Sequence, residues 1–213
     1  MKKYSHEIIN DDTRLQLNFM LTKSDNYYSP LHWHGHLEII FIQKGKMAAY
    51  INDRKYMLKE NDMLVVGSKE LHSTRTWGET DYLLLQIPTE YLSRVLNQVP
   101  LLQFQEYFPS ITRNNSQSGL CHCLLALAET YLNKEDGYLL HFSSVVYEFL
   151  YLLYKNHSHR ISPQAKEREN HNFERMEVII AYVKANYKED ISLNDAAKLI
   201  NVSPEHFCRL FKK

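Results

Sequence analysis

Residues 31–45 read LHWHGHLEIIFIQKG, and the expected fold follows from this segment. It sets His32, His34 and Glu38 in the spacing H-x-H-x3-E and ends on a glycine seven residues after Glu38. If the segment is extended, alternate side chains point to one face, so these three groups and His36 project together. Imidazoles and a carboxylate are costly to bury alone, so the spacing predicts a pocket for a metal, another ion or a polyhydroxylated molecule.

A second segment supplies a fourth polar group. Residues 61–66 read as a turn followed by an apolar run, Gly67 and Ser68 break that run, and His72 follows. Together the two segments resemble the paired motifs of the cupin barrel. In that family two antiparallel sheets bring two histidines, a carboxylate and a later histidine together inside a small jelly roll. The resemblance implies that His72 joins the first three groups.

The rest of the chain divides into a β-rich part and a helical part. Short β-like runs alternate with turn signals between Arg14 and Ile87, which predicts an antiparallel sandwich or barrel over about 13–88. Helices are expected over about 89–157. The first covers 90–98 with Thr89 as its cap, and two longer ones follow at about 119–132 and 138–154.

The two longer helices carry apolar residues at alternating three- and four-residue steps. This seam has two interpretations: a helical hairpin packed on the barrel, or a dimer interface. The members are Leu120, Leu124, Leu127 and Tyr131 in the first helix, and Leu139, Phe142, Val146, Phe149 and Leu153 in the second.

Residues 159–172 contain few apolar side chains and are expected to form a linker. Beyond them, Ser192 and Asp195 have the spacing of a helix-capping box, and Ser203 precedes Pro204 at the start of another helix. Two short helices joined by so tight a turn predict a helix-turn-helix over 173–213.

The run at 191–213, ISLNDAAKLINVSPEHFCRLFKK, resembles the first helix-turn-helix of AraC-type transcriptional regulators. The resemblance implies a cupin effector and dimerisation domain over 1–158, a linker, and a partial DNA-binding domain. Such regulators carry two helix-turn-helix units, whereas this chain stops at Lys213. The expectation is therefore a C-terminally truncated, homodimeric regulator that binds operator DNA weakly.

The expected DNA contacts lie on the last helix, whose N-terminal residues face base edges in such motifs. Arg209 offers bidentate recognition of guanine, and the two terminal lysines are placed for phosphates. The full set is Ser203, Glu205, His206, Cys208, Arg209, Lys212 and Lys213.

The favoured effector is a small polar molecule, above all a carbohydrate, with no cofactor required and no catalytic residue predicted. Aromatic faces that could stack on a sugar ring are Trp33, Tyr50, Trp77 and Tyr82. The alternative is a divalent metal (Zn, Ni, Fe or Mn) held by His32, His34, Glu38 and His72, in a metal sensor or a metal-dependent enzyme.

Composition limits the other classes of function. Lys+Arg and Asp+Glu both total 25, so no net charge draws the chain to nucleic acid or membrane, and any DNA contact is local. Three cysteines and an N-terminus without an apolar core favour a reduced, cytoplasmic setting. In regulators of this type an N-terminal arm, here Tyr4 to Asp12, can fold over the pocket and report its occupancy.

Overall fold

The computed structural model describes residues 5–111 and 117–211 and divides into two compact units. One unit spans Ser5–Arg160, and the other begins at Ile161. Each unit is described by itself. Among the described helices, none is both long and apolar enough to cross a bilayer.

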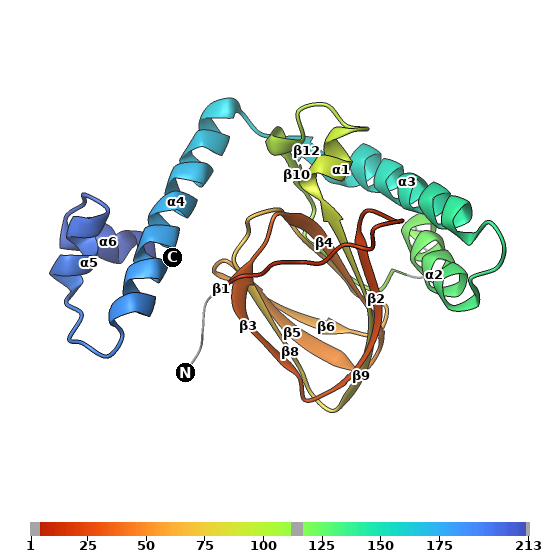
Figure 1. Ribbon diagram of the computed structural model, residues 1–213, viewed down its shortest axis with the longest axis horizontal. Coiled ribbons are helices and arrows are strands. Elements are labelled where there is room, and N and C mark those ends of the chain that lie inside the picture. The colour runs from red at the N-terminus through yellow and green to blue at the C-terminus, as the bar shows by residue number, and fades with distance from the viewer. Residues whose placement is uncertain (1–4, 112–116, 212–213) are drawn as a thin grey trace. The chain divides into compact units, whose positions relative to one another are not determined.

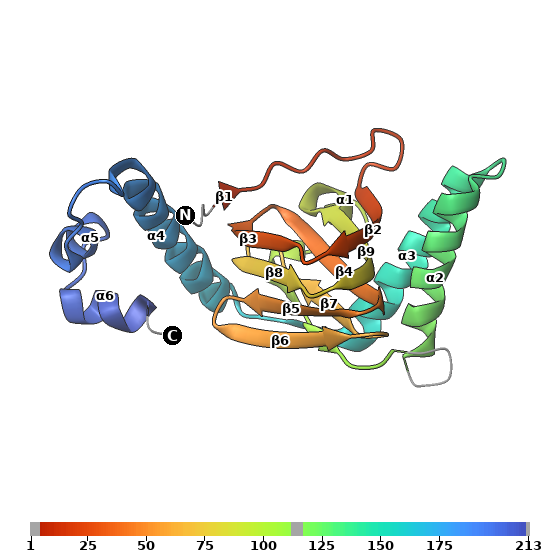
Figure 2. The ribbon, with the colours of Figure 1, turned by 90° about the horizontal axis from the view of Figure 1, so that it is seen from below.

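Two five-stranded sheets face each other in the first unit (Figures 1 and 2). The first sheet has the order β1 (Ser5–His6), β3 (Tyr28–Trp33), β8 (His72–Thr76), β5 (Lys46–Ile51) and β6 (Arg54–Lys59). The second has the order β11 (Tyr107–Phe108), β7 (Met63–Val66), β4 (His36–Lys44), β9 (Glu79–Pro88) and β2 (Asn18–Asp25). All pairings in these sheets are antiparallel except β1 with β3. The arrangement is the cupin jelly roll that the two sequence motifs predicted.

Strand alternation gives the second sheet two buried faces. On β4, Ile40 and Ile42 belong to the core between the sheets, whereas Ile39 and Phe41 belong to a second core on the outer face. Because both faces are covered, β4 reads as a nearly continuous apolar run.

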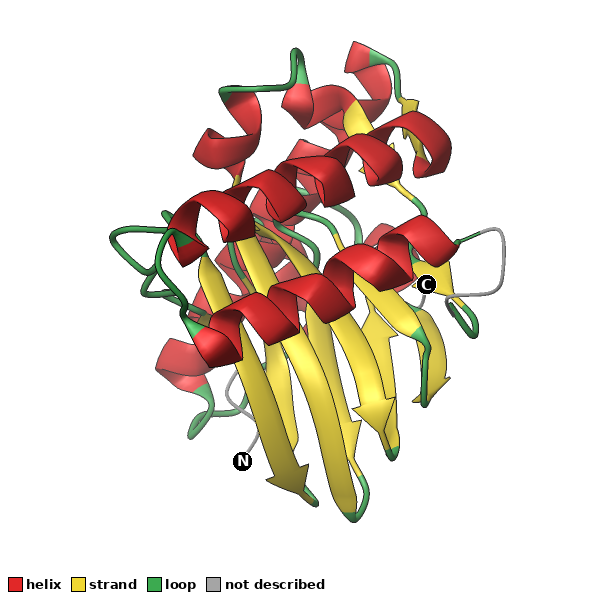
Figure 3. Cartoon of the chain, turned by 90° about the vertical axis from the view of Figure 1, so that its right-hand side faces the viewer, coloured by secondary structure: helices red, strands yellow, loops and turns green. Residues whose placement is uncertain are grey.

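Helices α2 (Ser118–Asn133) and α3 (Tyr138–His157) lie across the outer face of the second sheet (Figure 3). The apolar seam of these helices packs into the same core as Phe41, with Leu124, Val146 and Phe149 fully buried. The seam is therefore buried within its own chain, as the helical-hairpin interpretation expects.

The connection before these helices differs from the expected 90–98 helix. Helix α1 (Thr89–Ser93) is one short turn, and residues 94–98 form turns before a 3-10 helix, η1 (Val99–Leu101). Thr89 lies inside α1 and its hydroxyl donates to the carbonyl oxygen of Gly35 at 2.7 Å, so it does not cap the helix. The Thr89 hydroxyl therefore bonds to a residue distant in the sequence and not to the first turn of its own helix. Strand β10 (Leu102–Phe104) then pairs with β12 (Ser158–Arg160).

The second unit contains α4 (Pro163–Asn186), α5 (Leu193–Leu199) and α6 (Pro204–Phe211). The prediction of a linker over 159–172 is wrong for most of this range, because α4 already begins at Pro163. The Ser162 hydroxyl accepts from the backbone N–H of Ala165, and proline suits a first helical position. The charged residues that follow are good helix formers, which a scan for apolar periodicity alone does not detect.

The helix-turn-helix has its own small core, in which Phe207 of α6 packs with Ala197 of α5 and Ile179 of α4. The Ser192 hydroxyl accepts from the backbone N–H of Asp195 at 3.1 Å, which confirms the predicted cap of α5. Asn201 adopts a left-handed φ of 53° in the turn, a conformation that asparagine tolerates well.

Candidate functional site

The four predicted polar side chains converge between the two sheets. His32 lies on β3 directly opposite His72 on β8, and Glu38 enters from β4 of the other sheet. The centroid of the His72 ring lies 4.1 Å from that of His32 and 4.9 Å from that of His34. All four residues are at most 7% exposed.

The route by which they converge differs from the single extended segment expected from the sequence. Strand β3 ends at Trp33 and β4 begins at His36, so the chain crosses from one sheet to the other between them. His34 sits on this crossing. His36 lies near the rim, where its Nε2 atom is 3.2 Å from a carboxylate oxygen of Asp11. Two sheets, and not alternation along one strand, therefore assemble the site.

Glu38 is held by two hydrogen-bond donors. His34 donates from Nε2 to Glu38 Oε2 at 3.0 Å, and Gln86 on β9 donates from Nε2 to the same oxygen at 2.7 Å. Gln86 in turn accepts from the side-chain amide of Asn18 at 2.6 Å. Sequence reasoning missed Gln86, although a lone polar residue in the apolar run of β9 was the available signal.

These contacts set the charge of Glu38. Burial raises the pKa of this carboxyl, but the charge of His72 and the hydrogen bonds from His34 and Gln86 outweigh it and lower the pKa to about 2. Burial lowers the pKa of His72 to about 4. Because His72 is neutral near pH 7, the two hydrogen bonds keep Glu38 ionised there.

His72 presents an unsatisfied nitrogen to this carboxylate. Its Nδ1 atom lies 2.9 Å from the carbonyl oxygen of Glu70, which can only accept, so the proton is on Nδ1. The buried Nε2 atom has no hydrogen-bond partner and lies 3.6 Å from Glu38 Oε1. Two buried acceptors thus face each other, and either a cation between them or two ligand hydroxyls, one donating to each, would satisfy both.

The N-terminal arm reaches the same site, along the edge shown in Figure 2. The backbone N–H of Glu7 donates to the carbonyl oxygen of Trp33 at 2.9 Å, and the Glu7 carboxylate lies 3.2 Å from His32 Nε2. His6 stacks on Trp33 with ring centroids 4.2 Å apart. Burial opposes protonation of His32, but Glu7 and the Pro30 carbonyl raise its pKa above 6.5.

Comparison with known proteins places this geometry in a family. Residues 21–150, more than half of the chain, match the model of the AraC-like ligand binding domain. The chain belongs to this family.

Relatives of the AraC-like chain include two uncharacterized HTH-type transcriptional regulators of Bacillus subtilis. YdeC is 26% identical over 91% of this chain and 68% of its own length, and YbfI is 22% identical over 86% and 65%. The chain therefore spans about two thirds of the length of each. A cupin superfamily protein of Desulfitobacterium hafniense of solved structure is 18% identical over 34% of this chain and 68% of its own, with a TM-score of 0.33.

The four aromatic residues predicted to line the effector site do not gather there. Tyr82 faces the interior of the AraC-like domain, and burial raises its pKa. Trp33 is covered by His6 of the arm. Tyr50 is 42% exposed on the outer face, because its neighbour Ile51 takes the inward position. Trp77 is also outside, with the Arg75 guanidinium 5.9 Å from its ring centroid.

The predicted DNA-contacting residues lie mainly on α6. The Ser203 hydroxyl accepts from the backbone N–H of His206 at 3.2 Å and so caps this helix. Glu205 and Arg209 are exposed, whereas His206 and Cys208 are half-buried. A hydrogen bond with Ser203 lowers the pKa of Glu205, so the first turn carries a negative charge. Lys212 and Lys213 lie outside the described residues.

Proposed function

We propose that this chain is a ligand-responsive transcriptional regulator that binds a small polar effector between its sheets and operator DNA through α5 and α6. The relatives supply the general class, since they are named as transcriptional regulators. The observation that carries the effector site is the buried, unsatisfied Nε2 atom of His72, which faces Glu38 Oε1 at 3.6 Å. Such a protein works in the cytoplasm as a sensor and not as an enzyme.

A carbohydrate fits these acceptors best among polar effectors. Each sugar hydroxyl donates one hydrogen bond, so two neighbouring hydroxyls could donate one each to His72 Nε2 and Glu38 Oε1, while Gln86 and His34 keep the carboxylate ionised. Tyr50 is exposed and Trp77 does not belong to the core between the sheets, which leaves Tyr82 as the aromatic candidate inside the domain.

A thermal-shift screen of monosaccharides and divalent metals tests the effector, because a ligand of the native state raises the unfolding temperature. We expect a sugar to stabilise the wild type and the variant Tyr50→Phe, and to have no effect on Glu38→Gln, which keeps the shape but removes the charge. Equal stabilisation of Glu38→Gln and wild type would place the effector elsewhere.

DNA binding rests on the exposed Arg209 on a capped helix. Selection from a random-sequence duplex library with the full chain should enrich one motif. Arg209→Ala should relax the preference at one guanine, whereas Lys134→Ala, in the other unit, serves as a matched change of charge. Recovery of unenriched DNA by the wild type, with unaltered binding by Arg209→Ala, would contradict the assignment.

A divalent metal is the second candidate, and the donor set favours it in part. His32 and His72 each place Nδ1 against a backbone carbonyl, which leaves both Nε2 atoms for coordination beside Glu38. The donor atoms of His32, His34 and His72 all lie within 4.8 Å of one another, and Glu38 Oε1 lies 3.6 Å from His72 Nε2. His34 would orient Glu38, because its own Nε2 proton is already donated to that residue. Equilibrium dialysis of chelator-treated protein with Zn, Mn, Fe or Ni decides: stoichiometric uptake that His72→Phe abolishes supports the metal, and no uptake excludes it.

We also propose that the chain forms a homodimer. Since the apolar seam of α2 and α3 is buried within the chain, the second copy would bind the opposite side of these helices. A groove there is lined by His122, Cys123, Ala126, Ser144, Val145 and Glu148. Light scattering should give the dimer mass for wild type and the monomer mass for Val145→Arg, with Leu140→Arg as the exposed control on the same helix.

A further inference from the structure

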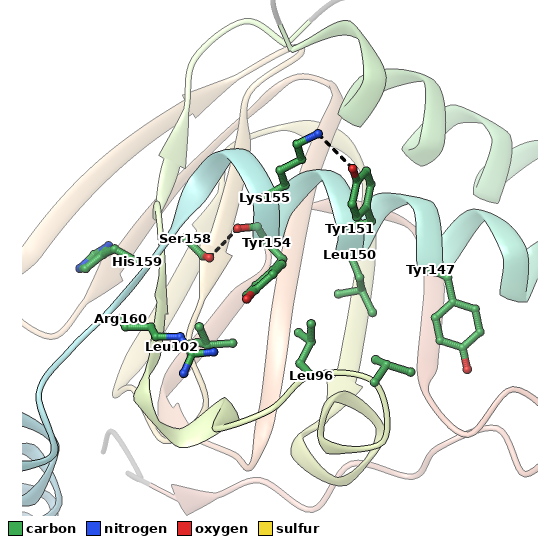
Figure 4. A pocket seen from close by; sticks show the side chains of 11 residues that line it. Leu96, Leu102, Tyr147, Leu150, Tyr151, Tyr154, Lys155, Ser158, His159 and Arg160 are labelled. Carbon is green, nitrogen blue, oxygen red and sulfur yellow. Dashed lines mark hydrogen bonds between the residues drawn. The ribbon is translucent and has the colours of Figure 1, made fainter.

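A pocket of about 750 Å³ lies outside the barrel, between α3 and the segment 95–102 (Figure 4). Its apolar part is formed by Leu96, Leu102 and Leu150, which face one another in the view of Figure 4. The Tyr154 ring of α3 extends into the same space. Every lining residue belongs to the described Ser5–Arg160 unit, so the pocket is independent of the helix-turn-helix.

The polar groups of this pocket are cations or neutral. Arg160 lies beside Leu102, with which it is paired across β10 and β12, and its guanidinium donates to the side chain of Gln98. Lys155 lies on the opposite rim, where its Nζ atom donates to the Tyr151 hydroxyl at 3.0 Å. Among the described residues that line the pocket, none is acidic. An anion at Arg160 would therefore meet a cation, and no lining residue would oppose it with a carboxylate.

A pocket with apolar walls and a cation at one end suits a ligand that has an apolar body and an anionic group. We propose that this pocket binds a small organic carboxylate with an aromatic or branched apolar body. The body would lie between Leu96, Leu150 and Tyr154, and the carboxylate would bind the Arg160 guanidinium, whose planar donors suit a carboxylate in two-point contact. This site is separate from the barrel effector of the proposed function.

The position of the pocket gives such a ligand a route to the second unit. Strand β12, which supplies Arg160, is held in a sheet only by three residue pairs with β10. Two residues after Arg160, Ser162 caps α4, the first helix of the unit that carries the helix-turn-helix. A ligand bound against β12 would stabilise the strand that leads directly into that helix, and amide exchange at 158–160 should slow when it binds.

Titration calorimetry of the full chain with 4-phenylbutyrate tests the proposal, with the neutral amide of the same acid as the paired probe. We expect saturable binding of the acid and at least tenfold weaker binding of the amide. Arg160→Gln should weaken the acid about tenfold, the loss expected for a charge-assisted hydrogen bond. Lys155→Gln should weaken it less. Lys134→Gln removes a lysine that also lies over a tyrosine but lines no part of the pocket, and should change nothing.

Three results would overturn the proposal. The first is no saturable binding of the acid at millimolar concentration. The second is equal binding of acid and amide, or of wild type and Arg160→Gln while both retain the same unfolding temperature. The third is a wild-type dimer that Leu96→Arg converts to a monomer, because the pocket would then be an interface between copies. None of these results bears on the effector site between the sheets.

Discussion

The Glu7 carboxylate lies 3.2 Å from the Nε2 atom of His32, so the N-terminal arm contacts one of the four clustered groups directly. That nitrogen is the one that a metal would take, since the Nδ1 atom faces the carbonyl oxygen of Pro30 at 2.7 Å. A metal in the site and the docked arm would therefore both bind His32 Nε2.

The arm contact should depend on pH. The folded-state pKa of His32 is raised, so its contribution is complete below 6.5 and is lost as the pH rises through the raised value. The pKa of Glu7 is lowered, so its contribution is complete above 4.5 and is lost as the pH falls through the lowered value. The protection factor of the Glu7 amide should therefore be highest between pH 4.5 and 6.5.

Glu7→Gln should abolish that maximum, and Glu90→Gln, an exposed change of the same chemistry, should preserve it. A maximum that survives in Glu7→Gln would show that the ion pair does not control the arm.

His72 should make the first unit less stable in mild acid. Its pKa is about 4 when folded and 6.5 when unfolded, so the unfolded chain binds more protons between these values and stability decreases as the pH falls from 6.5 to 4. At 1.36 kcal/mol per unit the loss is about 3 kcal/mol. Urea unfolding across this range measures it, and His72→Phe should flatten the curve. NMR titration of the His72 ring gives the pKa directly, and a value above 6 would refute the prediction.

Gln86→Leu should remove a buried donor to Glu38 and leave Asn18 without its acceptor. Glu38 keeps the hydrogen bond from His34 and Asn18 is only half-buried, so the cost is that of one hydrogen bond to a charged group, and the free energy of unfolding should decrease by about 1.5–3 kcal/mol. The pKa of Glu38 should rise from about 2, because one of its two hydrogen bonds is lost. Carbon-detected NMR of the Glu38 carboxyl as a function of pH measures this pKa. Gln43→Leu, on a partly exposed position of β4, is the control, and equal effects of both substitutions would be evidence against the role of Gln86.

Position 45 requires glycine for two reasons: its backbone conformation, and the backbone of Glu79, which lies too close to leave room for a side chain. Its φ is +86°, and a Cβ atom there would lie 2.5 Å from the carbonyl oxygen of Glu79. Gly78 also has a positive φ, of +63°, but open space around it. Gly45→Ala should therefore destabilise the protein by about 1–3 kcal/mol more than Gly78→Ala. Thermal unfolding of both variants measures the difference, and matching unfolding temperatures would mean that the β4–β5 turn can move.

Local patterns predicted much of the secondary structure because their causes are local. Strands such as β5 and β7 lie in the part of the chain where short β-like runs were predicted, since short apolar runs between turn residues need no distant partner to be recognised. The cap at Ser192 was expected from a spacing of three residues. The start of α4 was missed, because its charged first turns carry helix propensity without apolar periodicity.

The amino-acid sequence specifies which chemical groups meet, since H-x-H-x3-E and a later histidine supply all four members of the cluster. How these groups meet and what surrounds them depend on tertiary packing. Strand pairing between distant segments brings Gln86 and Glu7 to the four clustered groups. Tyr50 is not part of the site, because successive side chains of β5 point to opposite faces of the sheet and Tyr50 points outward. Residue types are local, whereas burial, protonation and hydrogen-bond partners depend on which segments pack together.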